Sequence, residues 1–180
     1  TRHNPEFTML ELYWAYADYD DMMTLTEDMV AAASLAIHGT TVIEYDGRDV
    51  DLTTPWRRAT MEELIVEHAG VHVSLDTPID ELRALCDKFG VETKPHYGPG
   101  KLILEIYEKT CEAQLWGPVF VTDYPVEVSP LSREHRARPG YTERFEAIVA
   151  GRELCNGFSE LNDPVIQRER FEAQEGDRDA

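Results

Sequence analysis

Apolar and polar residues alternate in two runs near the C-terminal end of the chain, Thr142–Ala150 and Glu153–Leu161. This alternation is typical of half-buried strands, and Gly151 between the runs favours an antiparallel hairpin. Side chains two residues apart share one face of a strand, so polar groups line up beside apolar ones. The aligned residues are Asn156, Phe158 and Glu160 on one strand, and Glu146, Ile148 and Ala150 on the other.

Glu153 is out of phase with this row. It joins Asn156 on one face only if the turn or a bulge near Gly151 re-aims its side chain. A carboxylate that points into a protein is costly unless it meets a cation. The pattern therefore indicates a metal ion, a cationic ligand or neighbouring arginines.

The remaining pattern predicts an α+β protein. Phe7–Tyr13 alternates as a strand that places Glu11 beside aromatic side chains, and Asp46-Gly47 predicts a hairpin between short strands. Capping residues and helical periodicity predict the helices. The predicted helices are 20–38, starting at Asp20 or Asp21, 60–69 after a Thr60–Glu63 capping box, 77–90, 101–115, and one that starts at Asp163-Pro164. A buried strand is expected at 119–122.

The segment Pro130–Tyr141 is rich in basic residues and contains two prolines. This composition predicts a mobile surface loop and a locally basic patch. The whole chain is acidic, with a net charge of −18 over 180 residues, which argues against strong sequence-independent binding of nucleic acid. Any contact with a polyanion must therefore be local.

The chain shows no apolar run of the roughly 20 residues that a membrane helix needs, and its start has no apolar signal region. We therefore expect a cytoplasmic protein that does not enter the membrane. Its three widely spaced cysteines are expected to be reduced thiols.

Three kinds of site follow from these side chains, each with a structural alternative. Glu146 and Glu153 could hold Mg²⁺ together with nucleotide phosphates, although surface carboxylates are commoner. A second site, for an ammonium group, could be formed by Glu11, Tyr13, Asn156 and Glu160, or these acids could pair with Arg144 or Arg152. A third, for adenine and its phosphates, could be formed by Arg2, His3, Asn4 and Phe7, although Phe7 as a core residue is the better interpretation.

Two longer segments resemble a known family. Arg2–Met23, with the residues RHNPEFTMLELYWAYADYDDMM, resembles the second half of motif 2 of class II lysyl-tRNA synthetases. Phe145–Asp163, FEAIVAGRELCNGFSELND, resembles the segment of the same family that binds Mg-ATP and lysine. The similarity runs along the whole chain and includes TDYPVEVSPLSRE. It implies an antiparallel β-sheet flanked by helices, as in the class II catalytic domain.

Within such a domain, residues 1–180 would form a part of the catalytic domain. Residues 1–52 and 119–163 would belong to the active-site sheet region, 53–118 to a mainly helical insertion, and 164–180 to a helix and a tail. Motif 1, the first motif 2 arginine and motif 3 do not occur in the sequence, so we expect a fragment without full activity of its own.

The resemblance also implies roles for individual residues. ATP would be held by Arg2, His3, Asn4, Phe7 and Asn156. Lysine would be bound by Glu11, Tyr13, Asn156, Phe158 and Glu160. Magnesium would be held by Glu146 and Glu153. No residue is implied as an acid–base catalyst, because positioning and charge neutralisation carry the rate of adenylate formation.

The implied activity is the ATP-dependent activation of L-lysine to lysyl-adenylate and its transfer to tRNA(Lys), by a homodimer in the full-length protein. One alternative is a paralogue that attaches lysine-like groups to elongation factor P. Another, from a different class, is a truncated, non-catalytic module that binds lysine or ATP.

Overall fold

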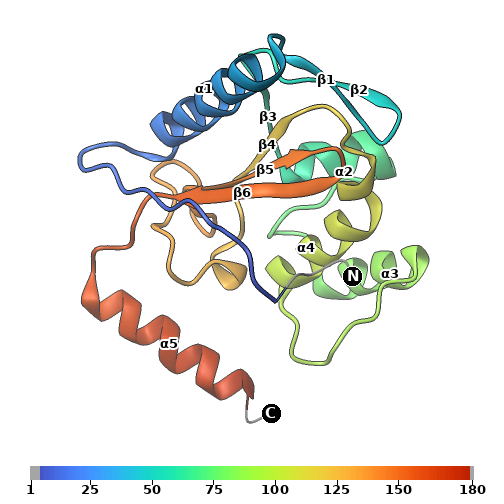
Figure 1. Cartoon of the computed structure of the whole chain (residues 1–180). Helices are drawn as coiled ribbons and strands as arrows, with labels where there is room; N and C mark the ends of the chain where they lie inside the picture. Colours follow the sequence, from blue (N-terminus) through green and yellow to red (C-terminus); the bar gives the residue numbers. More distant parts are fainter. Residues whose placement is uncertain (1–4, 179–180) are drawn as a thin grey trace.

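Four strands form the central sheet, in the order β3 (Arg57–Thr60), β4 (Val119–Thr122), β5 (Arg144–Val149) and β6 (Arg152–Phe158). The computed structural model describes the backbone of residues 5–178 and the side chains of residues 5–173. The sheet lies at the centre of the protein with helices on both sides (Figure 1). The helices are α1 (Tyr19–His38), α2 (Met61–Ala69), α3 (Ile79–Phe89), α4 (Pro99–Thr110) and α5 (Pro164–Arg178). Single 3₁₀ turns follow at η1 (Glu112–Gln114) and η2 (Val126–Val128).

The sheet is mixed, whereas the sequence predicted an antiparallel one. β4, β5 and β6 pair antiparallel, but β3 pairs parallel with β4. Parallel neighbours need a long crossover connection, and the helical segment from α2 to η1 supplies it. The predicted helical insertion is therefore the connection between two strands of the sheet.

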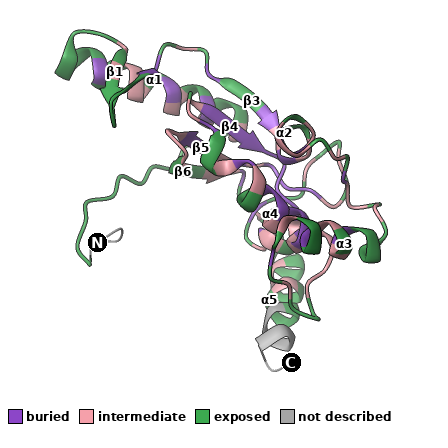
Figure 2. Cartoon of the chain, turned by 90° about the vertical axis from the view of Figure 1, so that its right-hand side faces the viewer, coloured by how far each residue is buried: buried purple, intermediate pink, exposed green. Residues whose placement is uncertain are grey.

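Two apolar cores lie on opposite faces of the sheet. Val119 and Val121 of β4 belong to the core that α2, α3 and α4 share, while Phe120 points to the other side. There it packs with Phe145 of β5 and with Met23 of α1. Buried residues accordingly concentrate in the sheet and at the helix surfaces facing it (Figure 2). Strand alternation thus divides β4 between the two cores.

Local capping residues fix where the helices begin. Asp18 caps α1 and accepts from the backbone N–H groups of Asp20 and Asp21, so the cap lies two residues before the predicted start. Thr60 and Glu63 form the predicted capping box of α2. The predicted helix 101–115 begins earlier, at Pro99, and ends as η1. Within the described residues, no helix combines the length and the apolar character needed to cross a membrane.

The carboxylate of Glu127 caps α4. It accepts from the backbone N–H groups of Gly98 and Gly100, at 2.9 Å each. A Cβ atom at either glycine would lie within 3 Å of this carboxylate. The Gly98-Pro99-Gly100 sequence therefore gives Glu127 access to the positive end of the helix.

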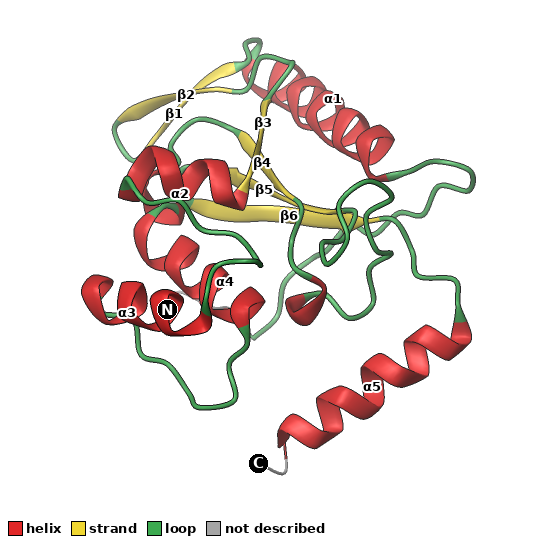
Figure 3. Ribbon diagram, turned by 180° about the vertical axis from the view of Figure 1, so that it is seen from behind, coloured by secondary structure: helices red, strands yellow, loops and turns green. Residues whose placement is uncertain are grey.

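The predicted hairpin around Asp46-Gly47 is present as β1 (Val42–Tyr45) and β2 (Arg48–Asp51). These strands form a separate two-stranded sheet. Among the described residues, the segment before Leu52 thus contributes no strand to the central sheet, where 1–52 was expected to take part. Figure 3 shows this hairpin apart from the central strands.

The strand predicted at Phe7–Tyr13 does not form. Residues 7–14 have no regular secondary structure, and Phe7 and Tyr13 are 71% and 82% exposed. A strand needs a neighbour for its backbone hydrogen bonds, and this segment pairs with no described strand. In Figure 2 it extends away from the sheet. Alternation alone was therefore insufficient to predict a strand here.

Candidate functional site

The predicted row of polar side chains is present on one face of the β5–β6 hairpin. Glu146 lies directly opposite Asn156, and Arg144 lies opposite Phe158. A register shift follows Ala147, so that Ile148 pairs with Glu153. This bulge places Glu153 on the same face as Asn156, whose side-chain amide donates to Glu153 Oε1 at 2.9 Å. The bulge therefore turns the side chain of Glu153 toward Asn156, as the sequence analysis required for these two residues to share a face.

Arg144 neutralises the most buried carboxylate of this row. Its guanidinium donates to Glu146 Oε1 at 2.5 Å and to Ser129 Oγ at 2.9 Å. Burial raises the pKa of Glu146 above its usual value, Arg144 acts against this, and the charge of Glu153 adds to the rise. Of the three partners expected for inward acids, a neighbouring arginine is therefore the one that Glu146 meets.

Buried polar atoms without partners surround Glu146. Within the described residues, neither Nε of Arg144 nor the hydroxyl group of Tyr107 has a hydrogen-bond partner. Such atoms are rare in folded proteins, and they mark places where water, an ion or a ligand completes the hydrogen bonding. A cavity of about 200 Å³ opens beside Arg144. It is lined by Val128, Ser129, Pro130, Leu131, Ser132, Arg144, Asn156 and Phe158.

Two of the three arginines of Pro130–Tyr141 pair with acids of the chain, and backbone bridges hold the segment, which corrects its interpretation as a basic patch on a mobile loop. Arg136 pairs with Glu143, from Nε to Oε1 at 2.7 Å, and Arg138 pairs with Asp123 at 2.5 Å and with Glu62 at 2.7 Å. Backbone bridges join the same segment to Glu160 and Thr142. The charges of Arg136 and Arg138 are thus neutralised by acids of the chain, whereas Arg133 is exposed.

His135 helps to hold this segment in place. Its Nδ1 accepts from the backbone N–H groups of Ala137 and Arg138, at 3.0 and 3.1 Å. A ring nitrogen that accepts carries no proton, so the proton of the neutral ring is on Nε2. That nitrogen lies 3.4 Å from the hydroxyl oxygen of Tyr19 and 3.9 Å from the carboxylate of Asp123.

The other predicted ligands of lysine and ATP are only partly brought together. Phe158 lines the cavity, and Glu160 is exposed at a backbone bridge with Ser132. Among the described residues, no hydrogen bond joins Glu11 or Tyr13 to β6, and both lie in the irregular exposed segment. The remaining ATP ligands are Phe7, which is exposed, and Arg2, His3 and Asn4, which lie outside the described residues.

Two carboxylates and an amide are the oxygen ligands that this face could offer to a metal ion. Within the described part of the chain, no group of three or more His, Cys, Asp or Glu residues is arranged to hold a metal. Mg²⁺ is usually bound by one or two carboxylates, with phosphates and water completing its shell. Glu146 and Glu153, beside unpartnered polar atoms, fit a metal that arrives with a phosphate ligand.

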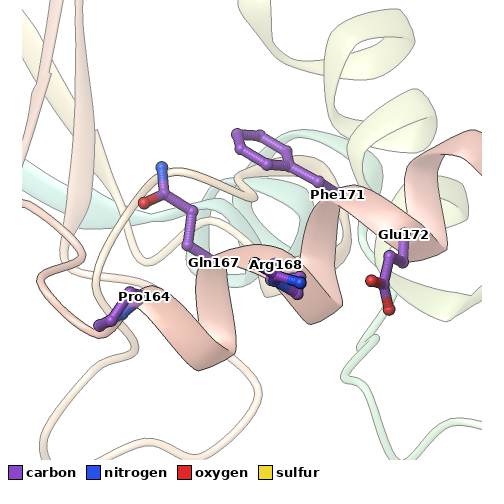
Figure 4. Close-up of a pocket in the computed structure, with 5 residues that line it drawn as sticks. All are labelled: Pro164, Gln167, Arg168, Phe171 and Glu172. Carbon is purple, nitrogen blue, oxygen red and sulfur yellow. The ribbon is translucent and has the colours of Figure 1, made fainter.

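A larger hollow of about 400 Å³ lies elsewhere, along α5. All of its lining residues come from that one helix, as Figure 4 shows. They are Pro164, Gln167, Arg168, Phe171 and Glu172. None of the predicted site residues lines it, so it has no part in the candidate site.

Sequence reasoning raised Arg144 only as a salt-bridge partner of Glu11 and Glu160, and it did not identify Ser129 as part of the site. Arg144 precedes Glu146 by two residues on one strand, so the strand period could have placed both on the same face. Ser129 could not have been found in this way, because it reaches the site from the turn after η2. Its contact with Arg144 depends on tertiary structure.

Comparison with known proteins identifies related sequences over the whole chain. The family described as tRNA synthetases class II (D, K and N) matches residues 1–180. Three curated relatives are each named lysine–tRNA ligase. The protein of Clostridium acetobutylicum is 48% identical over 181 residues, 99% of this chain and 35% of its own length. That of Chromohalobacter salexigens is 50% identical over 100% of this chain and 36% of its own length. That of Moorella thermoacetica is 51% identical over 100% of this chain and 37% of its own length. The chain thus spans little more than a third of these relatives.

Proposed function

Because the chain belongs to the class II tRNA synthetases of the D, K and N group, we propose that its protein is a lysine–tRNA ligase. The proposed reaction forms lysyl-adenylate and pyrophosphate from L-lysine and ATP, and then transfers lysine to tRNA(Lys). The curated relatives that carry this name support the assignment of the amino acid. The proposal extends to a cytoplasmic homodimer, which rests on the resemblance alone.

One structural observation supports the proposal most directly. The bulge in the hairpin gathers Glu146, Glu153 and Asn156 on one face beside a cavity. In the proposed reaction, the carboxylate of lysine attacks the α-phosphate of ATP, and pyrophosphate leaves. This face would hold the nucleotide's phosphates and orient the two substrates, with Asn156 between them. Positioning of this kind accounts for much of the rate in phosphoryl and nucleotidyl transfer.

Glu146 and Glu153 would hold Mg²⁺. When bound, the metal would neutralise the negative charge of the phosphates. Arg144 opposes the rise that burial causes in the pKa of Glu146, and so favours the ionised form of the carboxylate that a metal ion requires. Arg2, His3 and Asn4 would contact the ATP phosphates, and Phe7 would stack on adenine.

Lysine would lie between Phe158 and the acids Glu11 and Glu160, with Tyr13 offering its hydroxyl group. An ammonium group would neutralise the acids, whereas a neutral side chain would leave them unpaired at a cost of about 1–3 kcal/mol or more. Selectivity for lysine would therefore arise from the penalty that a neutral competitor incurs. Tyr13 and Glu160 are the proposed contacts of the ε-amino group.

Pyrophosphate exchange into ATP by the complete gene product tests this function. We expect exchange that requires lysine and Mg²⁺, and labelled lysine should then appear on tRNA(Lys). Exchange without lysine, or none at all, would reject the proposal. Transfer of the label to elongation factor P would favour the paralogue, and lysine binding without exchange would favour a non-catalytic module.

Glu160→Gln tests the amino acid site. We expect the KM for lysine to rise by about tenfold to a hundredfold, because the variant keeps the shape but loses the charge. Glu92→Gln is the matched control, since Glu92 is exposed and far along the chain in the loop after α3. An unchanged KM in Glu160→Gln would remove Glu160 from the lysine site.

A further inference from the structure

Arg136 connects two parts of the chain that are distant in sequence, the segment before β5 and the start of α1. Its Nε donates to the buried carboxylate of Glu143 at 2.7 Å, and its Nη2 donates to the same carboxylate at 3.1 Å. Nη2 also lies 3.2 Å from Oδ2 of Asp18, the residue that caps α1. The side chain of Glu143 is only 3% exposed, so this is a buried acid held by a two-point guanidinium contact.

A second contact joins the same two regions. The backbone N–H of Tyr19 donates to Ser159 Oγ at 3.2 Å, and the backbone N–H of Ser159 donates to the carbonyl oxygen of Glu143 at 2.9 Å. The hydroxyl group of Tyr19 faces His135. The start of α1 is therefore fastened to the end of the β5–β6 hairpin by both backbone and side-chain groups.

This junction limits where the preceding segment can go. Tyr13 is six residues before Tyr19, and six residues span at most about 20 Å. Ser159 is the immediate neighbour of Glu160. The chain therefore keeps Tyr13 within about 20 Å and Glu11 within about 28 Å of Tyr19, whereas Phe7 can lie farther away.

We propose that Arg136 is a positioning residue for the lysine site: it ties the start of α1 to the β5–β6 hairpin and so holds Glu11 and Tyr13 within reach of Glu160. This inference rests on the proposed function. It gives a role to one arginine of the basic segment Pro130–Tyr141, in which Arg136 and Arg138 bind acids of the same chain. The role is mechanical, and Arg136 touches neither substrate.

Arg136→Met removes the junction without adding a polar group. We expect the KM for lysine to rise about tenfold, and the KM for ATP to change less than about twofold, because the tether acts most on the nearest residues. Amide hydrogen exchange of Tyr19, whose N–H group donates to Ser159 Oγ, should become faster. Arg133→Met is the matched control, because Arg133 is an exposed arginine of the same segment whose side chain forms no hydrogen bond or ion pair with another described residue.

Two milder variants guard against loss of the fold. Asp18→Asn keeps a good helix cap but removes one charge from the junction, and Arg136→Lys keeps the charge but loses the forked contact. Both should give intermediate increases in the KM for lysine and in hydrogen exchange.

The outcomes separate this inference from the proposed function. If the wild-type protein shows no lysine-dependent exchange, the proposed function fails, and hydrogen exchange still tests the junction. If the wild-type protein is active but Arg136→Met keeps its KM for lysine and its slow hydrogen exchange, the junction has no positioning role. An equal rise in the KM for lysine and the KM for ATP would also overturn the positioning role, because that result indicates a general loss of structure.

Discussion

The side-chain amide of Asn156 donates a 2.9 Å hydrogen bond to Oε1 of Glu153, three residues earlier on the same strand. In a regular strand, residues three apart point to opposite faces. The bulge opposite Ala147 and Ile148 removes this opposition, so both side chains lie on the face of Glu146. An irregularity in pairing therefore creates the candidate metal site.

Glu146→Gln and Glu153→Gln should weaken binding of a divalent metal. Each variant removes one negative ligand and keeps the volume, so we expect about a tenfold loss in affinity for Mn²⁺ in the presence of ATP. Electron paramagnetic resonance of bound Mn²⁺ measures this directly in the complete gene product. Wild-type affinity in both variants would mean that the metal is held elsewhere, and Glu92→Gln should bind as the wild type does.

Gly100→Ala should destabilise the chain. The added methyl group would lie 2.7 Å from Cβ of Pro125 and 2.9 Å from the Glu127 carboxylate that caps α4. Overpacking of this kind costs about 1–3 kcal/mol, and a displaced cap adds to the loss. Thermal or urea unfolding measures the change. Gly117→Ala is a matched control, because no atom lies within 4 Å of its added Cβ. If both variants lose the same free energy of unfolding, contact with the Glu127 cap is not the cause of the loss.

Arg136→Met should make the free energy of unfolding depend less on pH in the acidic range. Burial would raise the pKa of Glu143, but hydrogen bonds from Arg136 and Ser159 outweigh burial and lower it below the ordinary value of 4.5. A carboxyl group whose pKa is lowered in the folded state contributes its full stabilisation at pH values above its pKa in the unfolded state. That stabilisation is lost as the pH falls through its pKa in the folded state.

Urea unfolding between pH 3 and pH 7 tests this dependence. The wild-type protein and Arg133→Met should lose stability in parallel below about pH 4.5, whereas Arg136→Met should lose less over this range. The same slope in all three proteins would show that Glu143 does not depend on Arg136.

Gly157→Ala should disturb the second core. Gly157 pairs with Phe145, and an added Cβ would lie 2.6 Å from the Phe145 ring. We expect a loss of about 1–3 kcal/mol. Phe145→Leu removes the ring that the added methyl group meets, so Gly157→Ala should destabilise this variant less than the wild type. A double-mutant cycle measured by urea unfolding should therefore show a coupling free energy of at least about 0.5 kcal/mol. Additive losses would show that the two positions do not interact.

Elements with local signals could be predicted from the sequence. The capping box at Thr60 and Glu63, the turn at Asp46-Gly47 and the hairpin around Gly151 each depend on residues close in sequence, and all are present. For the same reason, strand alternation predicted that Asn156 and Phe158 share one face, as do Glu146 and Ile148, whereas the register that pairs Glu146 with Asn156 was not predicted. These features involve only short-range contacts.

Features that depend on distant partners were not predictable. Phe7–Tyr13 has the alternation of a strand but no described strand to pair with, and Pro130–Tyr141 has basic residues whose acidic partners come from α2, β5 and the residues beside them. The parallel pairing of β3 with β4 likewise depends on a crossover through the helices. Composition and periodicity contain no information about such contacts.

The outer side of β6 has consequences for handling the protein. It is the last strand of the central sheet, and within the described residues its outer backbone groups have no strand partner. Arg152 and Glu153 protect its first half with charge, but Leu154 is 52% exposed and no charged residue follows before Phe158. Unprotected edges recruit strands from other molecules. The chain produced by itself is therefore prone to self-association through β6, and adding a lysine at this edge should improve its solubility.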